Sequence, residues 1–222
     1  MRREAALKKG EKKKRERELK KRAQRKAARG VSAARGPRVS PHVRQARGYP
    51  LEGCWAQKGW EESGLAATAV ARRQPDERLV YGVFLVDYYC LGVKDTFARA
   101  DVPPARFHAD FLARHMPGGQ PVAIGADLAH ELIYGAIEFA ARFGFRPHPD
   151  FALTQFILDP PEAHPPTGKV EFGREGKPFY VSGPNDDVDA IIARLMRTAG
   201  PGNFHYLLHL GEPPIDYFGE AD

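Results

Sequence analysis

Residues 65–90, LAATAVARRQPDERLVYGVFLVDYYC, decide the fold of this chain. Two apolar runs, 65–73 and 79–90, flank the turn-forming segment QPDER, and this pattern predicts an antiparallel β-hairpin. The second run is apolar at successive positions, so both of its faces should be buried. We therefore expect it to be a central strand rather than an edge strand of a β-sheet.

Downstream of the hairpin, periodicity and capping residues predict helices. The two prolines at 103–104 open a short helix. The clearest helix spans residues 127–143, where apolar side chains recur at 3.6-residue spacing, and Gly144 is placed to end it. A further helix is expected to start with Asn185 or Asp186 as its N-cap.

The other segments predict an α+β domain. The stretch 49–64, which contains both tryptophans, reads as a loop, and 151–158 is a short element between proline-rich loops. We expect a second hairpin from 169–172 and 178–181, and a final strand over 204–210. Four or five strands and three or four helices, without a repeating βαβ order, predict an α+β fold with a mixed, largely antiparallel sheet.

Charge divides the chain into two parts. Residues 1–48 contain 19 lysines and arginines against four acidic residues, whereas residues 49–222 contain 15 against 24. We predict a basic arm and linker over 1–48, largely disordered or frayed-helical, and an acidic globular α+β domain over 49–222. No apolar run is long enough for a membrane span, and the basic N-terminus has no secretory apolar region. Only two cysteines are present, which is typical of a reducing, cytoplasmic location.

The basic arm predicts nucleic-acid binding. Lysines and arginines contact phosphates without reading sequence, so structured RNA or a ribosome is the expected partner. A solubilising tail, a targeting address and attraction to an anionic membrane surface are the alternatives. The residues expected to contact phosphates are Lys12, Lys13, Lys14, Arg15, Arg17, Lys20, Lys21, Arg22, Arg25 and Lys26.

Asp87 is the first candidate for chemistry in the acidic domain. It lies in an otherwise apolar strand, where an unpaired carboxylate is costly, so it must be partnered or functional. With Lys94 and Asp95, and help from His130 or Glu131, it could form a metal-dependent hydrolase or nuclease site. The structural interpretation is that Asp87 ends the strand and either hydrogen-bonds the turn that follows or pairs with Lys94.

His130 and Glu131 begin the string HELIY, which resembles the start of a zinc-protease motif. Tyr134 occupies the place of the second histidine ligand, so that motif is excluded. A solvated helix face explains Glu131 equally well. We therefore predict no metal and no cofactor, and the absence of a diagnostic catalytic motif favours a binding protein over an enzyme.

Other polar and aromatic residues are expected to be structural. His205 and His209 lie in a predicted strand and are too far apart to share a metal ion. Asp186 and its acidic neighbours suffice as a helix cap, and both cysteines read as small buried hydrophobes. Four aromatic residues favour core packing, with base stacking as the alternative; they are Trp55, Trp60, Tyr88 and Tyr89.

Two stretches resemble a known family. The segments VFLVDYYCLGVKD (83–95) and GKPFYVSGPNDD (176–187) resemble sequences in a group of uncharacterised bacterial proteins. The resemblance covers roughly residues 49–210 and implies no activity. A protein-interaction module, in which the acidic domain binds a basic protein, is a further alternative to nucleic-acid binding.

Overall fold

The computed structural model describes residues 40–116 and 120–208. The described residues belong to one compact unit that starts at Ser40. The predicted arm up to Val39, together with His209, lies outside the described residues.

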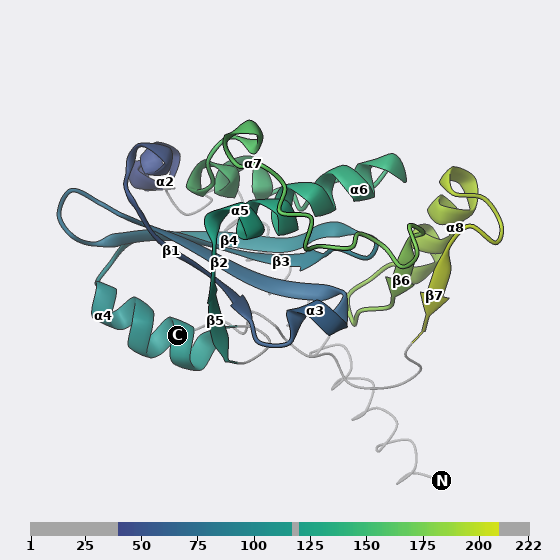
Figure 1. The fold of residues 1–222 in the computed structure, drawn as a ribbon, viewed down its shortest axis with the longest axis horizontal. Coiled ribbons are helices and arrows are strands. Elements are labelled where there is room, and N and C mark those ends of the chain that lie inside the picture. The colour runs from purple at the N-terminus through teal and green to yellow at the C-terminus, as the bar shows by residue number, and fades with distance from the viewer. Residues whose placement is uncertain (1–39, 117–119, 209–222) are drawn as a thin grey trace, which may run out of the picture. The chain divides into compact units, whose positions relative to one another are not determined.

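A five-stranded antiparallel sheet forms the centre of this unit, with the strand order β4-β3-β2-β1-β5 (Figure 1). The predicted hairpin is confirmed as β2 and β3, which pair from Arg73 opposite Leu79 to Leu65 opposite Asp87. Every residue of β3 is buried, and the strand has a neighbour on each side, as expected of an interior strand. The strands of the sheet are β1 (Leu51–Gln57), β2 (Leu65–Arg73), β3 (Leu79–Asp87), β4 (Gly92–Val102) and β5 (Pro121–Ile124).

Helices cover both faces of the sheet, because alternate residues of β2 and β3 point to opposite sides. Figure 1 shows helices on both sides of the sheet. Val70 and Phe84 pack with the helices on one face, whereas Ala69 and Tyr81 pack with Phe107 on the other. The first face carries α2 (Pro41–Gln45), η1 (Ala46–Gly48), α5 (Ala126–His130), η3 (Glu131–Gly135), α6 (Ala136–Arg142), α7 (Phe151–Thr154) and η4 (Gln155–Ile157). The second face carries α4 (Pro104–Arg106) and η2 (Phe107–His115).

The predicted helix over 127–143 is confirmed as the continuous run of α5, η3 and α6, in which η3 is a π-helical turn. Gly144 follows with φ +78°, and the N–H groups of Gly144 and Phe145 donate back to the last turn. This left-handed cap is the geometry that favours glycine at a helix end.

The predicted second hairpin is wrong. Segment 169–172 forms no strand, and β6 (Phe179–Val181) pairs instead in parallel with β7 (His205–Leu207). The helix α8 (Val188–Thr198) connects the two strands, and a crossover helix of this kind favours parallel pairing. Asp187, not Asn185 or Asp186, caps α8 through a hydrogen bond from the N–H of Ala190.

The structure also corrects the domain boundary and the loop expected over 49–64. Pro41–Gly48, assigned to the arm and linker, forms α2 and η1, and Val43 and Ala46 are buried in the core. The expected loop contains β1 and the short helix α3 (Trp60–Ser63). The described residues have the predicted α+β class, and the compact unit to which they belong begins at Ser40.

None of the helices in the described part of the chain has the length and apolarity needed to cross a bilayer.

Candidate functional site

The centre of the candidate site is His130, the last residue of α5. Its exposed fraction is only 4 %, and its ring contacts those of Tyr134 and His164. The π-helical turn of η3 begins immediately after it. Such turns inside α-helices occur frequently at functional sites, where the extra residue changes the direction of side chains.

A proline-rich loop brings two further polar side chains to this helix. Asp159 and His164 flank the short turn η5 (Pro161–Ala163), and prolines at 160 and 161 restrict the backbone there. His164 Nε2 lies 3.1 Å from Asp159 Oδ2. The Tyr134 hydroxyl donates to the backbone carbonyl of Asp159 at 3.2 Å, which ties the loop to the helix.

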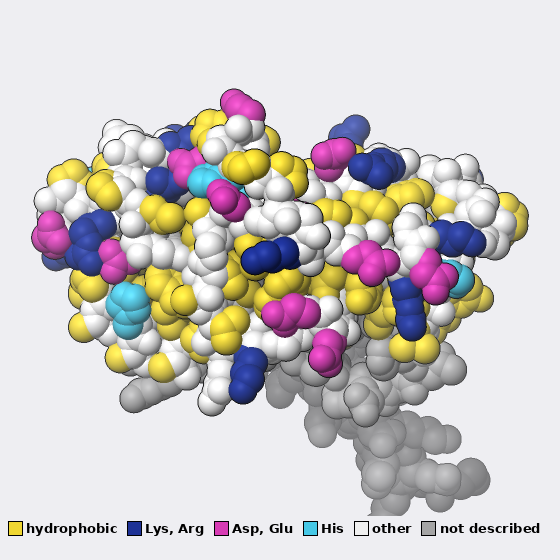
Figure 2. All heavy atoms as spheres, in the orientation of Figure 1, with side chains coloured by type: hydrophobic (Ala, Val, Ile, Leu, Met, Phe, Trp, Pro, Cys, Tyr) yellow, Lys and Arg dark blue, Asp and Glu magenta, His cyan; other side chains and the backbone are white. Residues whose placement is uncertain are grey.

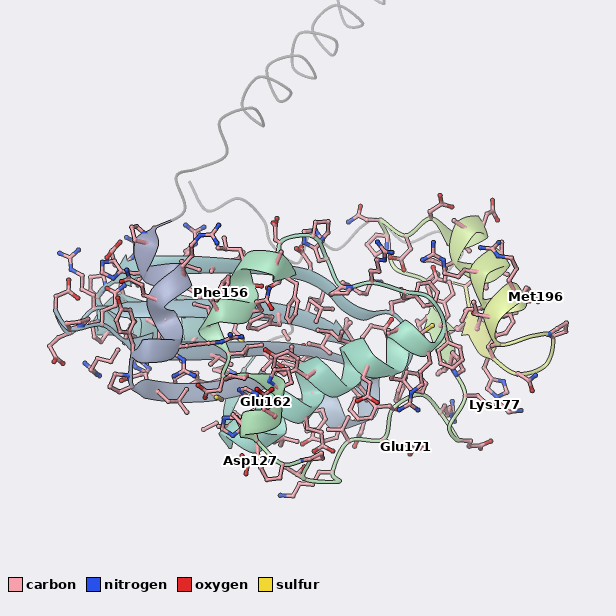
Figure 3. All side chains as sticks on the ribbon, turned by 90° about the horizontal axis from the view of Figure 1, so that it is seen from above. Asp127, Phe156, Glu162, Glu171, Lys177 and Met196 are labelled. Carbon is pink, nitrogen blue, oxygen red and sulfur yellow. The ribbon has the colours of Figure 1, made fainter. Side chains whose placement is uncertain are left out.

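The helix and the loop together form a cluster of three side chains, His130, Asp159 and His164. The rings of His130 and His164 have centroids 4.0 Å apart, and one potential ligand atom from each of the three residues lies within 4.8 Å of the others. His164 Nδ1 is 2.7 Å from Asp127 Oδ1, so both nitrogens of this ring face carboxylates. Figure 3 labels Asp127 of the helix and Glu162 of the η5 turn, and the cluster lies in the region of these two residues.

Arg72 of β2 holds Asp159 from the sheet side. Its side chain is buried, with Nε donating to the Ile157 carbonyl at 2.7 Å and Nη1 to the Tyr49 carbonyl at 2.9 Å. Its Nη2 lies 2.6 Å from Asp159 Oδ1 in an ion pair. Because a buried guanidinium needs charged and polar partners, this ion pair fixes the position of Asp159.

The protonation states follow from this geometry. Burial, reinforced by the neighbouring His164, lowers the pKa of His130 to about 4, so its ring is neutral at pH 7. Burial also acts to lower the pKa of His164, but hydrogen bonds to Asp159 and Asp127 outweigh it and raise that pKa. Burial acts to raise the pKa of Asp159, whereas its bonds to His164 and Arg72 prevail and lower it. The cluster therefore combines a neutral imidazole, a carboxylate and an imidazole held between two carboxylates.

Glu131, next to His130 in sequence, has a different role. Its carboxylate accepts hydrogen bonds from the N–H and hydroxyl of Thr167 and from the N–H of Gly168, the last at 3.0 Å. These bonds anchor the loop that follows His164. Glu131 thus stabilises the segment that delivers His164 to the cluster.

Asp87 is not part of this cluster. Its contacts match the structural interpretation, in which it ends a strand and hydrogen-bonds the turn that follows. It ends β3, and its Oδ1 accepts from the N–H groups of Tyr89 at 3.1 Å and Cys90 at 2.8 Å. Burial outweighs Lys94 and these donors and raises its pKa to about 6. Lys94 forms its ion pair with Asp186, at 2.9 Å, rather than with Asp87.

The structure does not bring the predicted catalytic residues together. Asp87 accepts from the N–H groups of Tyr89 and Cys90, and Lys94 pairs with Asp186. Glu131 accepts from Thr167 and Gly168. Among the described residues, no hydrogen bond or ion pair joins Asp87 or Lys94 to His130 or Glu131.

The remaining candidates lie outside this cluster. Burial raises the pKa of Cys54 to about 12 and raises that of Cys90 further, so both are thiols in the core. Trp60 and Tyr88 are buried and contact each other edge to face, which confirms core packing for this pair. His205 is an exposed residue of β7.

Sequence reasoning missed Asp159 and His164. His164 is 34 residues from His130, and only the docking of the proline-rich loop on α5 brings their rings together. The signal that could have found them is the segment DPPEAHPP itself, where prolines hold an aspartate and a histidine in a loop.

No protein-family model, curated protein or solved structure matches this chain. The resemblance at 83–95 and 176–187 accordingly stays a prediction.

Proposed function

We propose that this protein binds nucleic acid, with structured RNA or a ribosome as partner, through its basic N-terminal segment. The observation that carries the proposal is the segregation of charge along the chain. Residues 1–39 contain 17 lysines and arginines against four acidic residues, whereas residues 40–222 contain 17 against 24. A formal charge of +13 on one side of the Ser40 boundary and −7 on the other supports a division of labour.

The fold supports a narrower set of phosphate-contacting residues than the predicted arm of 1–48. Arg47 donates to the carbonyls of Leu158 at 2.7 Å and Gln155 at 3.1 Å, and its guanidinium lies over the Phe156 ring. It therefore serves the packing of η1 on η4. The phosphate contacts are assigned to residues 1–39, with Lys12 to Lys26 as their centre.

The described unit is a poor alternative surface for a polyanion. On the face shown in Figure 2, lysine and arginine side chains lie interspersed with aspartates and glutamates instead of gathering in one patch. Because its net charge is negative, long-range attraction to phosphates has to come from the basic segment. A cytoplasmic location, where RNA and ribosomes are present, belongs to the same proposal.

Full-length variants test the proposal without truncation. Replacing the ten residues Lys12, Lys13, Lys14, Arg15, Arg17, Lys20, Lys21, Arg22, Arg25 and Lys26 by glutamine removes ten positive charges and keeps the length. The control replaces only the four arginines among them by lysine, which keeps the charge. Binding to a labelled RNA hairpin and to duplex DNA of equal length is measured by fluorescence anisotropy.

We expect the glutamine variant to lose binding and the lysine control to retain it, because non-specific phosphate contacts depend on charge. With about six phosphate contacts, wild-type affinity falls roughly 10³-fold between 50 and 200 mM salt. Equal binding by the glutamine variant and wild type would overturn the proposal and leave a solubilising tail or a protein-interaction module as the function of these segments.

A further inference from the structure

His130 carries an unpaired nitrogen in the interior of the described unit. Its side chain is more than nine-tenths buried, and Nδ1 has no hydrogen-bond partner among the described residues. A buried polar atom without a partner is unfavourable, and such an atom in a native structure calls for an explanation such as a bound ion. The His164 ring lies beside it, with the two ring centroids 4.0 Å apart.

The side chains around this imidazole are those that transition metals prefer. Two histidines and one aspartate offer two nitrogen donors and one carboxylate oxygen, and these atoms lie within 4.8 Å of one another. Zinc takes imidazole at about 2.0–2.1 Å and carboxylate at about 2.0–2.2 Å, so ligand atoms around it are separated by roughly 3.5 Å. His164 Nε2 and Asp159 Oδ2, which lie at a hydrogen-bond distance of 3.1 Å, are already close to this separation.

A supporting shell is also in place. Asp127 Oδ1 holds His164 Nδ1 at 2.7 Å, which leaves Nε2 as the ligand atom and reproduces the carboxylate–histidine arrangement common at zinc sites. Arg72 holds Asp159 Oδ1, and this leaves Oδ2 directed at His164. These two contacts orient two of the three ligands from outside the cluster.

We propose that His130, Asp159 and His164 bind a divalent transition-metal ion, with Zn²⁺ as the best-matched ion. Imidazole nitrogens favour zinc and its first-row neighbours over magnesium and calcium, which prefer all-oxygen sites. Three protein ligands leave the fourth tetrahedral position for water or another small ligand. The ion takes the place of the proton between His164 Nε2 and Asp159 Oδ2, and ligand atoms that are now up to 4.8 Å apart approach to roughly 3.5 Å.

An ion can reach this site from solvent. The His164 side chain is 18 % exposed and that of Asp127 is 52 % exposed, whereas His130 closes the inner side. The proposal is independent of nucleic-acid binding, because none of these residues lies in the basic segment.

The test is titration of the untagged, chelator-treated full chain with Zn²⁺, followed by calorimetry and by competition with a fluorescent zinc indicator. We expect one zinc ion per chain, and visible absorption bands typical of tetrahedral coordination when Co²⁺ replaces zinc. His164→Gln and His130→Gln should each weaken zinc binding more than 100-fold. Asp127→Asn should weaken it about 10- to 100-fold, as removal of a supporting carboxylate does.

The matched control is His148→Gln. His148 is a partly exposed histidine that also lies near carboxylates, those of Asp95 and Asp150, but it is outside the cluster. Zinc affinity of this variant should equal that of wild type. If wild type binds no zinc in stoichiometric amount, or if His164→Gln binds as tightly as His148→Gln, the cluster is a purely structural hydrogen-bond network and the proposal fails. Because His164 is the more exposed histidine, its variant keeps the test valid even where His130→Gln fails to fold.

Discussion

Replacing Arg72 by methionine should destabilise the fold strongly, because this one side chain joins β2 to two segments of the helical layer. The substitution keeps an unbranched apolar stem but removes the guanidinium. It therefore leaves the carbonyls of Ile157 and Tyr49 without their donor and leaves Asp159 without its cation. Removing one partner of a buried ion pair costs about 3–5 kcal/mol of unfolding free energy. For a domain of this size that corresponds to a fall in Tm of roughly 6–20 °C.

The assay is urea denaturation followed by tryptophan fluorescence, with thermal melting in parallel. The control is Arg73→Met at the adjacent position of β2, where the arginine pairs with Glu52 and Glu77 and is more exposed. The Arg73 side chain is 34 % exposed, against 5 % for Arg72, and solvent screening weakens its ion pairs, so the control should lose much less stability than Arg72→Met. In the Arg72→Met background, Asp159→Asn should cost less than it does alone, because the two side chains act as a pair. An Arg72→Met variant as stable as Arg73→Met would refute the role given to Arg72.

Two further predictions concern stability at other places. The pKa of Asp87 is about 6 in the folded state, against an ordinary value of 3.8. Between pH 3.8 and 6 the folded state therefore binds more protons than the unfolded state. The free energy of unfolding should fall by about 3 kcal/mol as pH rises through this range. Asp87→Asn should remove this fall in urea titrations at pH 4, 5, 6 and 8, and an unchanged pH profile would contradict the burial argument. At Gly135, a Cβ atom would lie 2.2 Å from the Phe172 ring, whereas at Gly48 it would meet nothing within 4 Å. Gly135→Ala should therefore cost about 1–3 kcal/mol and Gly48→Ala much less, and equal melting temperatures of the two variants would show that the Phe172 contact is not tight.

The parts of the fold that sequence predicts correctly are those set by local patterns. The β2–β3 hairpin follows from two apolar runs around a five-residue turn, and the helix that contains His130 follows from its 3.6-residue periodicity and from Gly144. The sequence LEGCWAQ of β1 predicts a loop because it contains glycine and glutamine and lacks an apolar run, although the strand is partly buried. The parallel pairing of β6 with β7 depends on the docking of α8, which no local pattern records.

In the candidate site, too, local sequence patterns predict some features, whereas tertiary contacts decide the others. His130 could be singled out from the sequence, but its significance could not, because its partners come from a loop whose position is set by tertiary contacts. Arg72 and Asp159 are 87 residues apart in sequence, yet they lie 2.6 Å apart in the fold. The interpretation of Asp87 as a turn residue was available from sequence, since an aspartate at a strand end commonly accepts from the next N–H groups.

The salt dependence of RNA binding by the full chain tests the central claim most directly. With about six phosphates contacted by residues 1–39, a plot of log affinity against log salt concentration should have a slope near −5 for duplex nucleic acid. The variant whose ten basic residues between 12 and 26 are glutamine should bind too weakly for such a slope to be measured. A shallow slope in wild type, or the same steep slope in both proteins, would contradict the assignment of phosphate binding to the basic segment.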